Sequence, residues 1–235
     1  FSHLNPSGID GIKEEKLVPL QRFARLIRQT KPEIVSMENV KGLLDKGKDT
    51  IFKEFLDALS DCGYSVSYQV VDTSNYGVPQ KRMRLVLLAS RLGDIRLIPP
   101  THPGDTKKTV RDAIASLEPI KDGETSVTDL LHRACKLSPL NKKRIRATPK
   151  NGGSSSSWKE ELKLECHKKP GGKTFSWSVY GRMRWDEPSP TMTTQCTGIG
   201  NGRFGHPEQD RAISPREAAL IQTFPKNYQF FPSDG

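Results

Sequence analysis

The sequence predicts an α/β fold in which an open sheet is interrupted by an irregular inserted domain and then resumed. The first hundred residues alternate between helical and strand-like apolar spacing. After Pro99-Pro100, a long stretch is rich in turn residues and poor in periodicity. Helical spacing returns after Ser214. The three parts that we expect are residues 1–100, 101–212 and 213–235.

The first part begins with an expected amphipathic helix that ends before Pro32 and is followed by a buried strand at 33–37. A second helix is expected at 49–61, because its apolar residues share one side and Gly63 supplies a stop. The residues at helical spacing in the first of these helices are Leu17, Leu20, Ala24 and Ile27.

Two more strands and two short helices are expected further along the chain. Residues 64–70 alternate between apolar and polar side chains, as a half-exposed strand does, and residues 84–90 form an apolar run. This late pair of strands can form an antiparallel hairpin. Residues 109–117 have the pattern of a short helix, and Ser214 with Glu217 is a capping box in front of an apolar run.

Two polar motifs lie at the ends of predicted strands. Glu38-Asn39 follows the apolar segment that ends at Met37, where open α/β sheets place ligand chemistry. Arg82 and Arg84 stand two residues apart at a strand start, so their side chains are expected to point the same way. Taken alone, Glu38-Asn39 would be explained by a turn that follows a strand, and Arg82 with Arg84 by an ion-paired edge strand. Their order and spacing in one chain favour a shared site.

These motifs resemble those of the DNA (cytosine-5) methyltransferase family, in particular its bacterial restriction-modification members. Glu38-Asn39-Val40 matches the family's Glu-Asn-Val motif, and Gln80-Lys81-Arg82-Met83-Arg84 matches its Gln-x-Arg-x-Arg motif. The run Arg216-Glu217-Ala218-Ala219-Leu220-Ile221-Gln222-Thr223-Phe224-Pro225 is similar to the ninth motif. Gly181-Arg182-Met183-Arg184-Trp185, with Pro190-Thr191-Met192-Thr193-Thr194, is similar to the end of a target-recognition domain.

The resemblance implies the C-terminal part of a Rossmann-like methyltransferase sheet with an inserted irregular, mostly β target-recognition domain. Phe1-Ser2 matches the residues just after the family's Pro-Cys nucleophile motif, so the chain resembles a fragment that starts at that point. None of the four cysteines follows a proline. The implied cofactor is S-adenosyl-L-methionine, with its main binding loop outside this chain. We therefore expect the 235 residues alone to be inactive.

The resemblance also assigns roles to the matched residues. Glu38, kept protonated by burial, would donate a proton to N3 of a cytosine that has been flipped out of the duplex. Arg82 and Arg84 would donate hydrogen bonds toward the O2 side of that base. Residues 3–15 would form a mobile catalytic loop. The residues implied to bind the substrate are Asn39, Gln80 and Ser2.

The net charge of +10 is concentrated between His132 and Arg184, where fourteen Lys or Arg residues stand against three Glu residues. Basic groups neutralise phosphates, and polar and aromatic side chains contact grooves and bases. This composition favours double-stranded DNA as a partner over a merely solvated basic face. The residues expected to bind DNA are Arg182, Arg184, Thr191, Thr193, Thr194, Arg203, Lys142, Lys143 and Arg144.

Other features exclude several classes of protein. The longest apolar run is too short to span a membrane, and the sequence does not begin with a secretory leader. The scattered cysteines predict reduced thiols in a cytoplasmic protein, or in a nuclear one if the source is eukaryotic. His132 with Cys135, and Cys166 with His167, have poor spacing for zinc, so no metal site is expected.

Two other function classes remain open. One is a non-catalytic methyltransferase-like module that binds DNA, although such a module would not need Glu38 beside arginines. The other is a tRNA cytosine-5 methyltransferase, although an insertion of this length suits the major groove of duplex DNA. A complementary chain that carries the missing motifs is a further partner to test.

Overall fold

The computed structural model describes residues 18–45, 49–165 and 179–230. They belong to two compact units. Unit 1 comprises Phe1–Asp72 and Met83–Pro100, and unit 2 comprises Thr73–Arg82 and Thr101–Gly235. The segment 73–82, which the sequence pattern places in the first part, therefore clusters with the later residues.

Unit 1 is built on a three-stranded sheet of β1 (Ile34–Val40), β2 (Ser65–Asp72) and β3 (Met83–Ser90). The strand order is β1-β3-β2, and β3 is antiparallel to both neighbours. The expected antiparallel pairing of the last two strands is confirmed. β1 and β2 run in the same direction and are joined by a connection that contains a helix, as parallel strands require.

β1 is longer than its apolar pattern predicts. Glu38 and Asn39 lie opposite Val86 and Leu85 in the ladder, and not in a turn that follows the strand. Polar residues continue a strand wherever a neighbouring strand supplies backbone partners. That neighbour is β3, more than forty residues away in the sequence. The residues around β1 therefore do not by themselves predict that the strand continues through Glu38 and Asn39.

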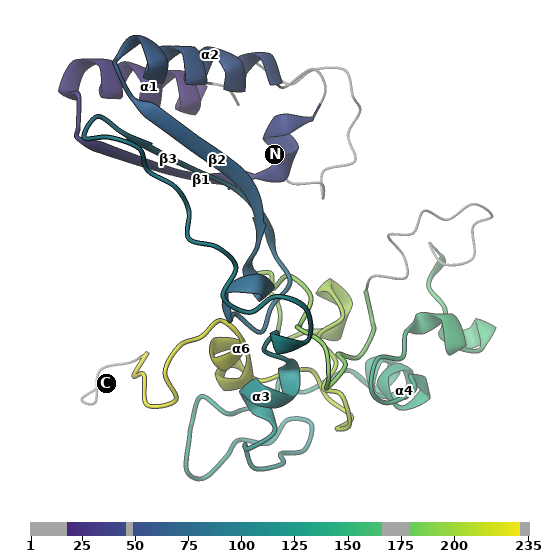
Figure 1. Ribbon diagram of the computed structural model, residues 1–235. Helices are drawn as coiled ribbons and strands as arrows, with labels where there is room; N and C mark the ends of the chain where they lie inside the picture. The colour runs from purple at the N-terminus through teal and green to yellow at the C-terminus, as the bar shows by residue number, and fades with distance from the viewer. Residues whose placement is uncertain (1–17, 46–48, 166–178, 231–235) are drawn as a thin grey trace. The chain divides into compact units, whose positions relative to one another are not determined.

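Two helices, α1 (Val18–Thr30) and α2 (Asp49–Asp61), cover one face of this sheet (Figure 1). Both helices were predicted, and Gly63 follows α2 with a left-handed φ of +79°. Phe23 of α1 and Phe55 of α2 stack with their ring centroids 5.7 Å apart. The buried core of unit 1 consists of Ala24, Ile27, Val35, Met37, Leu43, Phe52, Phe55, Ala58, Leu59, Tyr64, Leu85, Leu87 and Ala89.

Unit 2 consists of short helices and turns. Its described α-helices are α3 (Val110–Ile114), α4 (Pro139–Ala147) and α6 (Pro215–Ile221). The 3-10 turns of the two units are η2 (Lys41–Leu44), η3 (Thr73–Tyr76), η4 (Gly104–Thr106), η5 (Ser155–Ser157), η6 (Glu160–Leu162) and η8 (Ile199–Asn201). The predicted capping box of Ser214 and Glu217 is confirmed at the start of α6, and Thr109 with Asp112 forms another at α3.

The prediction that 101–212 is mostly β is wrong for the described residues. Isolated bridges such as Arg182↔Gly205 and Gly205↔Ala212 stand there in place of strands. Segments rich in Gly, Pro and Ser do not offer the alternating runs from which ladders form. The sequence pattern also does not predict α4, although Ser138 caps it and Pro139 occupies its first turn.

A buried ion pair anchors α6 within unit 2. The Arg211 Nη1 and Nη2 atoms each lie 2.7 Å from an oxygen of the Glu217 carboxylate, and both side chains are fully buried. The backbone N–H of Ser214 donates to the same carboxylate at 2.7 Å, and Arg211 Nε donates to the carbonyl of Ile120 at 3.1 Å. A buried charge is stable only with such partners. Polar contacts therefore join the irregular segments here, as ladders would in a sheet.

Candidate catalytic and DNA-binding residues

Glu38 and Arg84 form an ion pair on the sheet of unit 1. Arg84 Nε lies 2.5 Å from Glu38 Oε1. The strand register explains this contact, because Val40 lies opposite Arg84 and Glu38 is two residues earlier in the same strand. Diagonal neighbours on one face of a sheet are within reach of long side chains. The structure thus brings together two residues that the sequence assigned to one site.

The expected burial of Glu38 is wrong. Its side chain is 59% exposed, whereas that of Arg84 is 18% exposed. Val35 and Met37 point into the core under the helices, so the alternation of β1 directs Glu38 to the other face of the sheet. Within the described residues, Glu38 is held by the charge of Arg84 and not by an apolar pocket.

Asn39 and Gln80 make contacts inside the protein. Asn39 Oδ1 accepts a hydrogen bond from the backbone N–H of Val40 at 2.9 Å. Gln80 is buried, and its Oε1 accepts from the backbone N–H of Met192 at 3.1 Å. The Gln80 side chain thus ties two segments of unit 2 together, and its expected role in binding the substrate stays a prediction.

Arg82 lies just before β3, and its carbonyl accepts from the backbone N–H of Thr73 at 3.0 Å. Its side chain is half-buried. Arg82 clusters with unit 2, whereas Glu38 and Arg84 belong to unit 1, so a shared site for all three stays a prediction. Ser2 and the expected catalytic loop at 3–15 lie outside the described residues.

The expectation that Arg182 contacts DNA is wrong, because this side chain is only 1% exposed. Its guanidinium donates to four backbone carbonyls, and Nη2 lies 2.5 Å from Asp210 Oδ1. The four carbonyls are those of Ile145, Thr148, His206 and Gln209. A guanidinium with this many internal acceptors holds loops of unit 2 together and has no exposed surface for a base or a phosphate.

Arg144 of α4 is also buried, with 7% of its surface exposed, which corrects its expected contact with DNA. Its guanidinium carbon lies 5.5 Å from the ring centroid of Trp158 and 5.3 Å from that of Tyr180. Its Nε donates to the carbonyl of Leu162 at 3.0 Å. These cation–π and hydrogen-bond contacts attach α4 to the segments that follow it.

The other residues expected to bind DNA are at least partly accessible. Arg184, Thr191, Thr194 and Lys143 are exposed, and Lys142, Thr193 and Arg203 are half-buried. Four of these side chains already have partners within the protein. Lys142 Nζ lies 2.7 Å from Asp122 Oδ2, and Thr191 Oγ1 donates to the carbonyl of Lys81 at 2.8 Å. Arg184 pairs with Glu187, and Arg203 donates to the carbonyl of Gly152. Whether these residues bind DNA stays a prediction.

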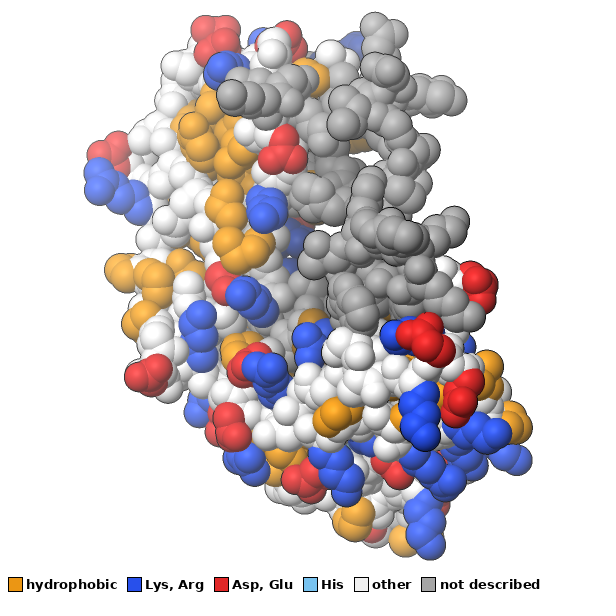
Figure 2. Space-filling model, turned by 90° about the vertical axis from the view of Figure 1, so that its right-hand side faces the viewer, with side chains coloured by type: hydrophobic (Ala, Val, Ile, Leu, Met, Phe, Trp, Pro, Cys, Tyr) orange, Lys and Arg blue, Asp and Glu red, His pale blue; other side chains and the backbone are white. Residues whose placement is uncertain are grey.

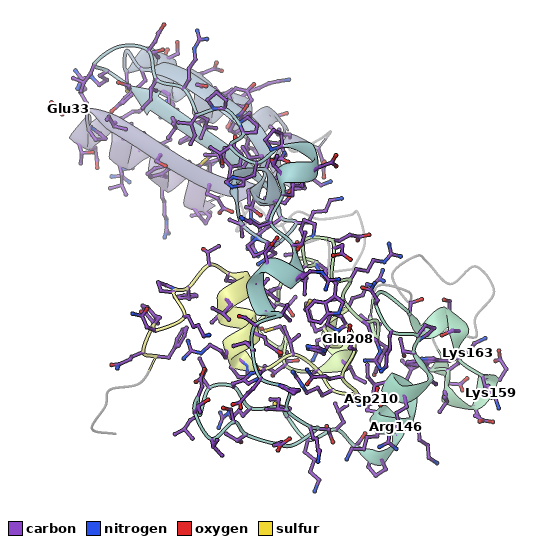
Figure 3. All side chains as sticks on the ribbon, turned by 60° about the horizontal axis from the view of Figure 1, so that its bottom comes forward. Glu33, Arg146, Lys159, Lys163, Glu208 and Asp210 are labelled. Atoms are coloured by element: carbon purple, nitrogen blue, oxygen red, sulfur yellow. The ribbon has the colours of Figure 1, made fainter. Side chains whose placement is uncertain are left out.

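Basic side chains gather on the surface of unit 2. Figure 2 shows a dense group of Lys and Arg side chains toward the lower end of the face that it draws. In Figure 3, Lys159 and Lys163 project from the segment around η6, and Arg146 of α4 lies beside Asp210. The Arg146 Nε and Asp210 Oδ2 atoms are 3.9 Å apart, so this acidic residue offsets only part of the positive charge.

Sequence reasoning missed the buried polar network that surrounds Glu217. His206 lies within it, and its Nδ1 accepts hydrogen bonds from the backbone N–H groups of Glu208 at 3.2 Å and Gln209 at 3.0 Å. Burial lowers the pKa of His206 to about 4, an effect that Arg211 reinforces and Glu217 opposes. A signal was present in the sequence, since Arg211 flanks the capping box that contains Glu217.

Comparison with known proteins identifies the family. The model of the C-5 cytosine-specific DNA methylases matches residues 10–235. The chain belongs to this family. It is 51% identical to the type II methylase M.HgiDII of Herpetosiphon aurantiacus over 91% of its own length, and 33% identical to the type II methyltransferase M1.BsuMI of Bacillus subtilis (strain 168) over 93%.

The chain spans 60% of the length of M.HgiDII and 49% of that of M1.BsuMI. Among solved structures, it is similar to a prophage-encoded protein of E. coli whose crystal structure is described as that of a DNA modification methyltransferase. The TM-score is 0.61 at 20% sequence identity, over 93% of this chain and 66% of the other. This likeness supports a methyltransferase fold of mixed α/β content. No helix among the described residues has the length and apolar character needed to cross a membrane.

The family generally uses S-adenosyl-L-methionine, but the glycine-rich run at 198–202 does not fit a cofactor loop. Its centre forms the 3-10 turn η8, with neither a strand before it nor an α-helix directly after it among the described elements. A cofactor loop of this kind needs the strand–loop–helix arrangement. We therefore assign no residue of this chain to the cofactor.

Proposed function

We propose that this chain is part of a DNA cytosine-5 methyltransferase that modifies a flipped cytosine at a specific duplex site. Unit 1 would belong to a Rossmann-like sheet, and the segment 101–212 would be the inserted target-recognition domain. The Glu38–Arg84 ion pair is the observation that carries this proposal, because it places a carboxyl group beside a fixed guanidinium within the family's motifs.

In the proposed reaction, a cysteine thiolate outside this chain adds to carbon 6 of the base, and negative charge develops at N3. The carboxyl group of Glu38 would donate a proton to N3, and Arg84 would donate hydrogen bonds toward O2. Because Arg84 Nε and Glu38 Oε1 are 2.5 Å apart, the pair has to separate before both groups contact the base. When bound, S-adenosyl-L-methionine would supply the methyl group for carbon 5. Loss of the carbon 5 proton and release of the cysteine from carbon 6 would then give the methylated base.

The recognition part of the proposal depends on unit 2. The basic residues that stay accessible, Lys143 and Arg184 among them, would contact the phosphates and grooves of double-stranded DNA. The buried Arg182 and Arg144 would instead fix the loops that present those residues. The nucleophile and cofactor loop would come from the part of the relatives' length that this chain does not cover, or from a complementary chain.

Glu38→Gln tests the catalytic assignment. In a protein that joins this chain to the missing part, the amide keeps the shape of Glu38 but cannot transfer a proton. Turnover at saturating DNA and cofactor should fall by about 10²- to 10⁴-fold while DNA binding stays nearly intact. Glu33→Gln, which changes an exposed carboxylate just before β1, is the matched control and should keep full turnover.

Wild-type turnover in the Glu38→Gln variant would show that Glu38 has only a structural role at the strand. The same assay with tRNA in place of duplex DNA separates the proposed substrate from the alternative one. Methylation of tRNA alone would contradict the proposal that the substrate is DNA.

A further inference from the structure

An exposed ion pair between Arg184 and Glu187 has no evident structural purpose. Arg184 Nη1 lies 2.7 Å from Glu187 Oε1, and the two side chains are 52% and 57% exposed. An exposed pair of this kind contributes little to stability. The stability of unit 2 therefore gives little reason for its position and orientation.

The backbone that carries this pair is held at several points. The N–H of Met183 donates to the carbonyl of Gly205 at 2.9 Å, and the N–H of Trp185 donates to Asn151 Oδ1 at 2.8 Å. At the other end, the carbonyl of Glu187 accepts from the N–H of Val110 at 3.0 Å. The segment 183–187 is therefore a fixed support for two exposed side chains.

Trp185 lies between the two charged residues in the sequence, and its side chain is held by contacts inside unit 2. Its ring is buried, and its Nε1 donates at 2.7 Å to Oε1 of Glu208, which is labelled in Figure 3. The guanidinium carbon of Arg111 lies 5.4 Å from the centroid of the same ring. The indole cannot turn without breaking these contacts, and this adds to the rigidity of the segment.

The Arg184 side chain itself is placed by Gly152. This glycine has a left-handed φ of +104°, and a Cβ atom there would overlap the Cγ, Cδ and Nε atoms of Arg184. The Arg184 stem thus lies directly on the bare α-carbon. Arg203 Nη2 also donates to the carbonyl of Gly152 at 2.7 Å. Gly152 therefore contacts two arginines, Arg184 through its α-carbon and Arg203 through its carbonyl.

A pre-oriented arginine with a carboxylate partner matches the major-groove edge of a G·C base pair. Guanine presents the acceptors O6 and N7, which a guanidinium contacts in bidentate fashion, and cytosine presents the N4 donor, which a carboxylate accepts. The contact between Arg184 and Glu187 uses one nitrogen and one oxygen, so each group retains further donors or acceptors. A phosphate suits this position less well, because the Glu187 carboxylate would repel it.

We propose that Arg184 and Glu187 together read one G·C base pair of the target site, with Gly152 as the residue that positions Arg184. This inference rests on the proposed function of unit 2 in binding duplex DNA. It assigns sequence reading to the segment 183–187 and separates it from the phosphate contacts made by lysines such as Lys143.

The test is selection of duplexes from a randomised library by this chain, followed by sequencing of the bound fraction. The wild type should prefer G·C at one position by roughly 5- to 150-fold over other base pairs. Arg184→Gln and Glu187→Gln should each reduce that preference at the same position and leave the others unchanged. Gly152→Ala should act in the same direction, because its methyl group displaces Arg184.

Two matched variants control for nonspecific effects. Glu160→Gln removes a carboxylate from another i,i+3 ion pair of unit 2, the one with Lys163. Gly104→Ala introduces a methyl group at a left-handed glycine, with φ of +57°, that has open space around its Cβ position. Both should retain the wild-type preference. Circular dichroism spectra of Arg184→Gln and Glu187→Gln should match that of the wild type, since the Arg184 pair is exposed.

The outcomes separate this inference from the function on which it rests. If the wild-type chain does not bind duplex DNA, the proposed function fails together with the inference. If it binds but shows no preference for G·C at any position, or if the three variants keep the wild-type preference, the inference alone is overturned. Equal weakening for all sequences in Arg184→Gln also overturns it, because that result identifies a phosphate contact.

Discussion

His206 should make the stability of unit 2 fall steeply between pH 6.5 and pH 4. The side chain is 3% exposed, and its Nδ1 accepts hydrogen bonds from two backbone N–H groups, those of Glu208 and Gln209. A proton on Nδ1 would point at these two N–H groups and break both hydrogen bonds. The fold therefore requires the neutral ring. Burial lowers the pKa of His206 from 6.5 to about 4.

The other charges near His206 act in opposite directions. Glu217, whose Oε1 lies 3.7 Å from His206 Nε2, favours the protonated ring, whereas Arg211, Arg182 and His132 disfavour it. The folded-state pKa is the lower one, so the unfolded chain takes up the proton first as the pH falls. The stabilising contribution of the neutral ring is therefore complete above pH 6.5 and is lost by about pH 4. A difference of roughly 2.5 pKa units corresponds to about 3 kcal/mol.

Urea denaturation followed by tryptophan fluorescence measures this effect directly. All three tryptophans, at 158, 177 and 185, fall within the residues of unit 2. His206→Asn is the informative variant, because the amide oxygen can replace Nδ1 as the acceptor but does not titrate. The free energy of unfolding of the wild type should drop by about 3 kcal/mol more than that of His206→Asn between pH 7 and pH 4. Equal pH dependence of the two proteins would refute the reasoning.

Two further predictions concern the arginines and lysines of unit 2. Arg182→Met should lower the free energy of unfolding by at least about 1–3 kcal/mol, because it leaves buried carbonyls without a donor, while Arg184→Met should change it by less than about 1 kcal/mol. Urea titration of both variants checks this, and similar losses would contradict it. DNA affinity should fall steeply with salt, and Lys143→Ala should reduce the slope of log affinity against log salt by about 0.9 for all sequences alike. Arg22→Ala on α1 of unit 1 is the control, and a salt-independent affinity would show that the basic surface does not bind phosphates.

The fold of unit 1 could be predicted from the sequence because its signals are local. Helical apolar spacing and a left-handed glycine define α2, and alternation or an apolar run defines the later strands. The extension of β1 through Glu38 and Asn39 could not be predicted, because it depends on pairing with β3. Unit 2 was harder for the same reason. Its isolated bridges depend on contacts between segments far apart in the sequence, as do the contacts of Arg182 with the residues around 145 and 209.

The candidate site shows a similar division. Motif order was enough to join Glu38 with Arg84, since strand alternation and register then bring their side chains together. It was not enough to tell exposed arginines from buried ones. Arg182 and Arg184 are two residues apart in one motif, yet the first is buried among carbonyls and the second is 52% exposed. The two residues are of the same type and lie in the same basic segment, so only the contacts made by the surrounding loops decide which of them is buried.

The exposure of Glu38 places a requirement on the proposed chemistry. General-acid catalysis gains from the exclusion of water, because electrostatic interactions with the reacting base are stronger in a site without solvent. Within the described residues, Arg84 is the group whose side chain contacts the Glu38 carboxyl group. A base that enters the site would have to take Arg84 away from Glu38 and shield Glu38 from water at the same time. The proposed reaction therefore needs the flipped cytosine itself to complete the environment of Glu38.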